Sequence, residues 1–345
     1  MKNIISPFIT IVVPVKNEEL FIESTLKQLL SQDFPVDRFE IIVVDGMSKD
    51  GTKEIVTRLS HSHPQIKLVE NPKGLSSAGR NIGFRMGRGD IFLVVDGHCF
   101  IPDKNLLRNI VDCFEKSGAQ CLGRPQPLDP PGLTTFQKAV ALARSSRIGH
   151  SSNSLIYSSY EGFVSPVSVG AVYKREVFDT IGYVDENFDA CEDVEFNYMV
   201  EKAGLKTYIS PHLTIRYYPR KTLKGLFSQM KRYGRGRFQF IKKHPETINF
   251  DMLVLPAFVM GLGIFLLSLL CIAGCGIYSI STSLWPSLSG FIFVMYGFYL
   301  FIIVAESIRI AFKNGWRYLW FLPPIFFIIH FCLGWGFIER IFKGP

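Results

Sequence analysis

The chain has 345 residues, which is enough for an α/β domain with a sizeable core and a smaller second part. Its formal charge of +8 is unevenly distributed, because residues 1–201 contain 21 Lys and Arg against 26 Asp and Glu. Residues 202–245 contain 12 Lys and Arg and no acidic residue. The acidic first part argues against a nucleic-acid-binding protein, and the basic segment is expected to face anionic membrane lipids.

Short apolar runs alternate with amphipathic helical patterns through the first 120 residues. Strands are expected at Phe8–Val15, Glu40–Val44, Ile66–Val69 and Ile91–Val95, with a weaker one near Ala119–Leu122. This alternation predicts an α/β fold, Rossmann-like, with a mostly parallel sheet and flanking helices. In such a sheet, ligands bind beyond the carboxyl ends of the strands.

Three polar clusters follow these strands, at residues 16–19, 45–52 and 96–98, and we expect them to meet at one edge of the sheet. Taken alone, Asp45 and the turn after it have a simpler explanation as a strand-to-helix connection, with Thr52 capping the next helix. A carboxylate at a strand end is also well placed to bond a base or a ribose hydroxyl.

Asp96 and His98 follow the fourth expected strand, two residues apart. In an extended segment this spacing puts both side chains on the same side. Two such ligands can hold a divalent ion, which would neutralise a diphosphate leaving group. The alternative is a histidine that is only solvated in its loop.

Glu192, Asp193 and Glu195 stand at the start of a helix expected at Val194–Ala203. Acidic residues favour the first turn of a helix because of its dipole, and this alone explains such a cluster in most proteins. Here the neighbouring residues are small or apolar, which predicts a partly enclosed pair. Enclosure tunes a carboxylate towards general-base catalysis.

A cationic run at residues 229–237 contains two glycines. Glycine is costly in a helix, so the run is expected to form a loop whose backbone and arginines approach phosphate closely. The alternative is a cationic helix that faces lipid.

No charged residue occurs between Asp251 and Glu306, a length that accommodates two membrane-spanning helices. They are expected at about 253–280 and 284–305, and a third apolar stretch occupies about 318–338.

Pro323 and Pro324 lie inside the third apolar stretch and predict a kinked or re-entrant segment. The positive-inside rule places the basic segment 202–245 and the basic loop 309–317 in the cytoplasm. The uncharged loop 281–286 then lies on the opposite side.

Together, the order and spacing of these motifs resemble glycosyltransferase family 2, of the GT-A fold, over about residues 8–240. The matching residues are Pro14, Asn17 and Glu18; Asp45, Ser48, Asp50, Gly51 and Thr52; Gly79, Arg80, Asn81 and Gly83; Asp96 and His98; and Glu192 and Asp193.

The resemblance implies a role for each matched group. The residues expected to bind a nucleotide-sugar are Pro14, Asn17, Glu18, Asp45, Ser48, Asp50, Arg80, Asn81 and Asp96. The family's Asp-x-Asp metal motif is replaced by Asp96-Gly97-His98, which implies Mg²⁺ or Mn²⁺ at Asp96 and His98. Asp193 takes the position of the catalytic base, with Glu192 positioning the acceptor or orienting the base.

The run from Gln229 to Tyr233 resembles the Gln-x-x-Arg-Trp motif of membrane polysaccharide synthases, with Tyr in place of Trp. The residues expected to contact the diphosphate or the acceptor are Gln229, Arg232, Tyr233 and Arg235. Together with His98 and the terminal hydrophobic segments, this motif is most similar to bacterial membrane glucosyltransferases of the succinoglycan-biosynthesis type.

The expected activity is the transfer of a sugar, with glucose as the first candidate, from a UDP-sugar to a lipid-linked (polyprenyl-diphosphate) saccharide. The transfer is expected to invert the anomeric centre. A processive polysaccharide synthase is one alternative, and a non-catalytic membrane protein that binds nucleotide or lipid is another. The expected domains are 1–220 for catalysis, 221–250 as a basic juxtamembrane segment and 251–345 in the membrane. The protein is expected in the inner or plasma membrane with its catalytic domain in the cytoplasm.

Overall fold

The computed structural model describes residues 7–150, 154–274 and 284–343. The chain divides into two compact units, each assembled from two stretches of sequence. The first unit comprises Met1–Leu133 and His150–Pro219, and the second comprises Thr134–Gly149 and Arg220–Pro345. A short segment from the middle of the chain therefore belongs with its C-terminal part.

The first unit contains a sheet with the strand order β3-β2-β1-β4-β8-β6-β9-β7. Its strands are β1 (Ile9–Val15), β2 (Phe39–Asp45), β3 (Ile66–Glu70), β4 (Ile91–Val94), β6 (Cys121–Gly123), β7 (Gly162–Val164), β8 (Gly170–Lys174) and β9 (Thr207–Ile209). The first four strands pair in parallel, whereas β8 is antiparallel to both β4 and β6. A separate pair joins β5 (Cys99–Phe100) to β10 (Arg216–Tyr217).

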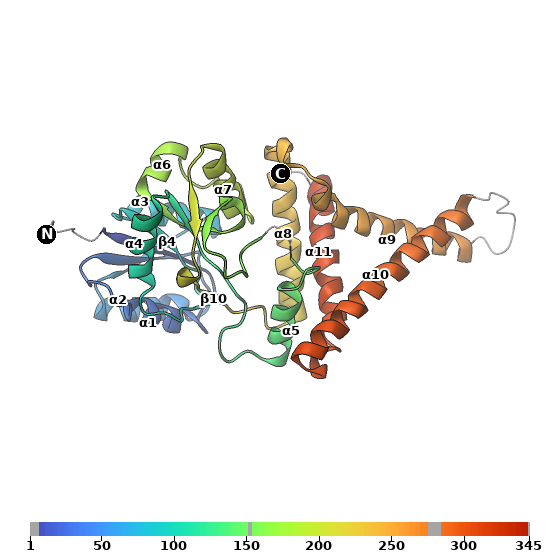
Figure 1. The fold of residues 1–345 in the computed structure, drawn as a ribbon, viewed down its shortest axis with the longest axis horizontal. Coiled ribbons are helices and arrows are strands. Elements are labelled where there is room, and N and C mark those ends of the chain that lie inside the picture. The colour runs from blue at the N-terminus through green and yellow to red at the C-terminus, as the bar shows by residue number, and fades with distance from the viewer. Residues whose placement is uncertain (1–6, 151–153, 275–283, 344–345) are drawn as a thin grey trace. The chain divides into compact units, whose positions relative to one another are not determined.

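Helices cover both faces of this sheet (Figure 1). They are α1 (Ile22–Leu30), α2 (Thr52–Ser62), α3 (Ser76–Met86), α4 (Leu106–Ser117), α6 (Arg175–Ile181) and α7 (Glu192–Lys202). Successive side chains of a strand point to opposite faces, so Ile11 and Val13 enter one apolar core while Val12 enters the other. The predicted α/β fold is confirmed, and each expected strand lies within two residues of an observed one.

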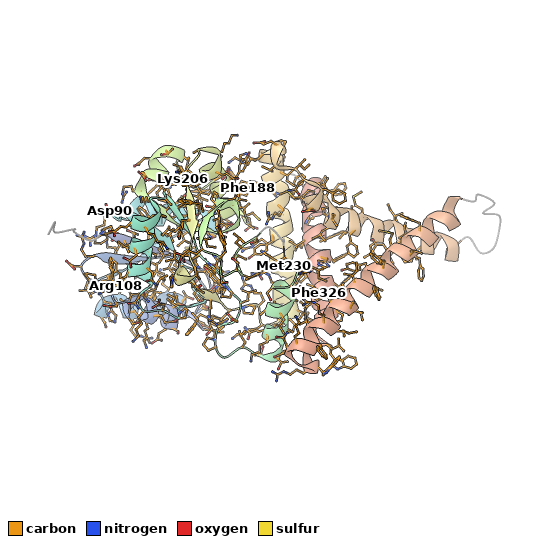
Figure 2. The ribbon with its side chains drawn as sticks, viewed as in Figure 1. Asp90, Arg108, Phe188, Lys206, Met230 and Phe326 are labelled. Atoms are coloured by element: carbon orange, nitrogen blue, oxygen red, sulfur yellow. The ribbon has the colours of Figure 1, made fainter. Side chains whose placement is uncertain are left out.

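The second unit is helical. Its helices are α5 (Thr135–Arg144), α8 (Leu223–Lys243), α9 (Phe250–Gly274), α10 (Leu284–Asn314) and α11 (Leu322–Lys343). Its core joins residues of α5, α8, α10 and α11, and Met230 of α8 and Phe326 of α11 are two of its members (Figure 2). Apolar packing thus holds α5 to helices of the second unit that are distant from it in the sequence.

The loop expected within residues 229–237 is wrong, because α8 is a continuous helix through this run. The buried Gly234 and Gly236 face inwards. A Cβ added at Gly234 would overlap the carbonyl of Leu333 in α11. Glycine is therefore placed here for close approach of two helices, and the packing offsets its unfavourable helix propensity.

Among the described residues, three helices are long and apolar enough to cross a membrane: Phe250–Ser268, Gly290–Asn314 and Leu322–Lys343. The expected span at 253–280 agrees with α9 as far as Gly274, and its remaining residues lie outside the described part of the chain. The helix α10 continues past the expected end of the second span at residue 305 to Asn314, and it carries Glu306 and Arg309 as an ion pair on its last turns.

Candidate active site

The turns after β1 and β2 are joined by side-chain hydrogen bonds. The Asn17 backbone N–H donates to Ser48 Oγ at 2.8 Å, and the Lys49 N–H donates to Asn17 Oδ1 at 2.8 Å. The Glu18 N–H donates to Thr52 Oγ1 at 2.7 Å. The structure thereby brings the first two polar clusters together at the carboxyl edge of the sheet.

Asp45 ends β2 and is 2% exposed. Its carboxylate accepts a bond from the Ser48 N–H at 3.1 Å, which fixes the turn that follows. Asp50 is a more exposed carboxylate that accepts bonds from Thr52 and from the Glu19 N–H. Burial raises the pKa of Asp50, but these hydrogen bonds outweigh it and hold the pKa below its usual range.

The third cluster is tied to the first by His98, whose Nδ1 lies 2.8 Å from Glu18 Oε1. This carboxylate orients the imidazole ring, as carboxylates bonded to the other ring nitrogen do for histidine metal ligands. Asp96 stands two residues earlier, after the end of β4. No group of three or more His, Cys, Asp or Glu residues that could hold a metal occurs among the described residues. The assignment of a cation to Asp96 and His98 therefore stays a prediction.

The side chain of Arg80 is 14% exposed and interacts with the acidic residues of the site. Its Nη2 lies 3.4 Å from Glu192 Oε1. Burial lowers the pKa of Arg80, but the carboxylates of Glu192, Asp193 and Asp96 more than offset this and raise it overall. Arg80 Nε is buried and has no hydrogen-bond partner within the described structure. Asp96, which follows β4, and the acidic pair of α7 therefore all interact electrostatically with the Arg80 guanidinium.

Glu192 and Asp193 differ in their environments although they are neighbours. Glu192 is 7% exposed, and burial raises the pKa of its carboxyl group, with Asp193 adding to the increase and Arg80 opposing it. Asp193 is partly exposed, and its Oδ1 accepts from the Val194 N–H at 2.9 Å. Asp193 is therefore the member of the pair that solvent or a substrate can reach.

A strained backbone positions the pair, because Cys191 has φ of 62° immediately before α7. Left-handed backbone is uncommon for residues other than glycine and is often found at functional sites. On the buried side of α7, the Tyr173 hydroxyl donates to Asn197 Oδ1 at 2.8 Å and so joins β8 to α7.

Asn81, expected to contact the nucleotide, is 1% exposed and makes structural contacts. Its Nδ2 donates to the Val184 carbonyl at 2.7 Å and to Glu186 Oε1 at 2.8 Å, and its Oδ1 accepts from the Val184 N–H. Asn81 thus holds the segment before α7 against α3. Pro14 of β1 packs closely against Gly79 of α3.

Arg124, which follows β6 and is 1% exposed, is a residue of the site that the sequence does not predict. Its Nη2 donates to the Val94 carbonyl at 2.9 Å and to Tyr217 Oη at 2.6 Å. Arg124 therefore links the end of β4, two residues before Asp96, to a strand whose Tyr217 ring packs edge-on against His98. A lone arginine after a three-residue strand carries no local signal of this role.

The Gln-x-x-Arg-Tyr motif lies on α8, in the second unit. Gln229 Nε2 donates to Tyr233 Oη at 3.3 Å, one helical turn away. The guanidinium of Arg144, from α5, lies 6.0 Å from the centre of the Tyr233 ring. Arg232 and Arg235 are partly buried on the same helix. The motif thus belongs to the helical unit and is packed against α5.

Comparison with known proteins identifies the family. A model described as glycosyl transferase family 2 matches residues 10–182. The succinoglycan biosynthesis protein ExoA of Rhizobium meliloti (strain 1021) is 33% identical over 236 residues, which cover 68% of this chain and 70% of that protein. The chain belongs to glycosyl transferase family 2.

This family 2 glycosyltransferase has relatives that match almost its whole length. It is 26% identical over 344 residues, 98% of each chain, to the dolichyl N-acetyl-alpha-D-glucosaminyl phosphate 3-beta-D-2,3-diacetamido-2,3-dideoxy-beta-D-glucuronosyltransferase of Methanococcus voltae. Its fold is similar to a mannosyltransferase from Pyrobaculum calidifontis, solved in complex with GDP-Man and Mn²⁺ (TM-score 0.62, 17% identity, covering 99% of this chain and 89% of that chain). The first unit of the glycosyltransferase has the GT-A fold.

Proposed function

We propose that this glycosyltransferase transfers a hexose, with glucose as the first candidate, from a UDP-sugar to a hydroxyl group of a polyprenyl-diphosphate-linked saccharide. The transfer adds one sugar and inverts the anomeric centre. The observation that carries the proposal is the ion pair of Glu192 with the partly buried Arg80, on which Asp193 and Asp96 also act electrostatically. These interactions support a base that acts close to residues suited to a diphosphate.

In the proposed reaction, Asp193 accepts the proton of the acceptor hydroxyl. The acceptor oxygen attacks the anomeric carbon from the face opposite the leaving group. The bond from that carbon to the UDP oxygen breaks, and UDP departs with the electron pair. Glu192 contacts the acceptor or orients Asp193, and the Arg80 guanidinium keeps both carboxylates in place.

Donor binding is assigned to the joined turns. Asp45 and Glu18 would bind the nucleoside, and the polar groups of Asn17, Ser48 and Asp50 line the same edge. A divalent cation bound at Asp96 and His98 would neutralise the diphosphate as it leaves. Arg232 of the second unit would stabilise the departing charge, together with Gln229, Tyr233 and Arg235 at the diphosphate or acceptor.

The choice of acceptor is supported by the relatives. The names of two relatives refer to succinoglycan biosynthesis and to a dolichyl-phosphate-linked sugar. The apolar helices of this chain would hold the enzyme at the membrane in which such lipid-linked acceptors reside. The positive-inside rule supports a cytoplasmic catalytic domain, because the basic residues of α8 directly precede α9.

The test is a screen of nucleotide-sugars with the purified full-length chain, a divalent cation and a polyprenyl-diphosphate-linked saccharide. We expect UDP release from one UDP-sugar, dependent on both the cation and the acceptor, and a product longer by a single sugar. A ladder of longer products would support a processive synthase, to which the Gln-x-x-Arg-Tyr motif also points. Release of GDP in place of UDP would contradict the donor assignment.

A further inference from the structure

Two helices of the second unit lie side by side along most of their length, α8 and α11 (Figure 1). Leu226 and Met230 of α8 share an apolar core with the first turns of α11. Further along, the rings of Phe238 and Phe337 lie 5.2 Å apart. A Cβ added at Gly336 would overlap the Lys231 carbonyl, so the two backbones are in close contact.

The helix α8 is unsuited to the interior of a bilayer. It carries seven Lys and Arg and no acidic residue over its 21 residues. One of these, Lys231, pairs with Glu339 of α11 at 3.0 Å, and Lys242 and Lys243 at its end are exposed. At about 1.5 Å per residue, α11 is roughly as long as a bilayer's hydrocarbon layer is thick. If α11 crossed the membrane, it would carry α8 and these charges into the hydrocarbon, which is strongly unfavourable.

A second contact points in the same direction. His330, near the middle of α11, bonds through Nε2 to the Ile148 carbonyl at 2.7 Å and through Nδ1 to Tyr299 Oη at 3.0 Å. Ile148 belongs to a segment, Thr134–Gly149, that leaves the catalytic unit and returns to it. Its helix, α5, has ten residues and is too short to cross a bilayer. The middle of α11 therefore contacts a segment whose two ends both connect to the catalytic unit, and which must lie on the same side of the membrane as that unit.

The surface of α11 differs from that of the other two apolar helices. Of the residues in its most apolar stretch, 50% are buried, whereas only 11% are buried in the corresponding stretches of α9 and α10. Its exposed residues include Trp335, and Trp320 lies exposed just before it. Tryptophan is enriched at the level of the lipid headgroups, and the cations of α8 complement anionic lipids there.

We propose that α11 does not cross the membrane. It lies with α8 on the headgroup surface of an anionic bilayer, and the chain crosses the bilayer twice, through α9 and α10. Both ends of the chain are then on the same side. This inference concerns the membrane face of the second unit and does not depend on the proposed donor or acceptor.

The decisive test is the accessibility of tags in the full-length chain. Single epitope tags are placed at the N-terminus, between residues 278 and 279, and at the C-terminus, and protease is added to membrane vesicles of one known orientation. We expect the two terminal tags to be cleaved in the same vesicles and the tag between α9 and α10 to be cleaved only in vesicles of the opposite orientation. A C-terminal tag protected where the N-terminal tag is cleaved would overturn the proposal.

Depth measurements provide an independent check in the folded enzyme. A variant that keeps only Trp335, through Trp285→Phe, Trp316→Phe and Trp320→Phe, is reconstituted with lipids brominated near the headgroup or near the acyl-chain end. The reference is Phe298→Trp in a chain lacking the four native tryptophans, because Phe298 is 59% exposed on α10. We expect deep bromines to quench the reference more strongly than Trp335. Equal deep quenching of the two would contradict a surface position.

Discussion

The two acidic residues at the start of α7 differ in burial, since Glu192 is buried and Asp193 is partly exposed. The burial of Glu192 has a consequence for the stability of the fold. Burial raises the pKa of Glu192 above that of a free glutamic acid, so the folded state binds a proton that the unfolded state has already released. Stability must therefore fall as the pH rises from about 4.5 through the raised pKa. We expect Glu192→Gln to remove this part of the pH dependence in thermal unfolding of the detergent-solubilised protein.

Glu201 lies on the exposed side of the same helix and provides the matched control. Glu201→Gln should leave the slope of melting temperature against pH as it is in the wild type. If Glu192→Gln also left the slope unchanged, the burial of Glu192 would not be coupled to folding in the way that the structure indicates.

His98 in place of a second aspartate predicts a preference among cations. An imidazole nitrogen suits transition metals better than Mg²⁺, whereas carboxylates suit Mg²⁺ and Mn²⁺ alike. We expect UDP release to be faster with Mn²⁺ than with Mg²⁺ at equal concentration, and His98→Asp to reduce that ratio by about 10-fold or more. An unchanged ratio in the variant would mean that His98 does not contact the cation.

Arg124 is predicted to position the end of β4 for cation binding. Arg124→Met leaves the Val94 carbonyl and the Tyr217 hydroxyl without their donor, and we expect the cation concentration for half-maximal activity to rise about 10- to 100-fold, as when groups that support metal ligands are removed. Arg124→Lys should restore part of this. A fall in melting temperature with no change in cation dependence would assign Arg124 a structural role only.

For single residues, the sequence predicts the candidate site residues that lie at the end of a strand or at the start of a helix, such as Asp45 and Asp193. It does not predict that Asn81 is occupied by the Val184 backbone, nor that Arg124 lies under the site. Both depend on contacts between segments far apart in the chain, for which local pattern has no signal.

Among the elements, the strands follow from apolar runs and their flanking turns, and their observed limits differ little from the expected ones. For α8 the sequence favours a loop over the alternative of a helix, because two glycines have a poor helix propensity and the local pattern does not show the packing that they permit. A helix partner whose backbone approaches Gly234 cannot be recognised without the tertiary structure.

Gly234→Ala tests this explanation of α8. The new methyl group would overlap the Leu333 carbonyl, and overpacking of this kind typically costs about 1–3 kcal/mol, more than alanine gains from its helix propensity. We expect a lower melting temperature of the detergent-solubilised chain. Gly263→Ala is the control, since a Cβ at that position on α9 has no neighbour within 4 Å. Destabilisation of equal size in both variants would contradict the packing role.

For the whole molecule, composition predicts an acidic α/β part followed by a basic segment and apolar helices. It does not predict that residues 134–149 leave the first unit and pack with the helices of the second. The apolar residues of α5, among them Ala139 and Val140, are too few and too small to mark it as a membrane-associated helix. Only the partner surface on α8 and α11 determines where this short helix lies.

The central claim is that Asp193 is the base of a glycosyl transfer reaction. The most direct measurement compares turnover of the wild-type chain and Asp193→Asn with the donor and lipid-linked acceptor found by the screen, in the same membrane mimetic. We predict a loss of about 100-fold or more in kcat, with donor binding and melting temperature close to wild type. A folded Asp193→Asn variant that transfers sugar at nearly the wild-type rate would contradict the claim.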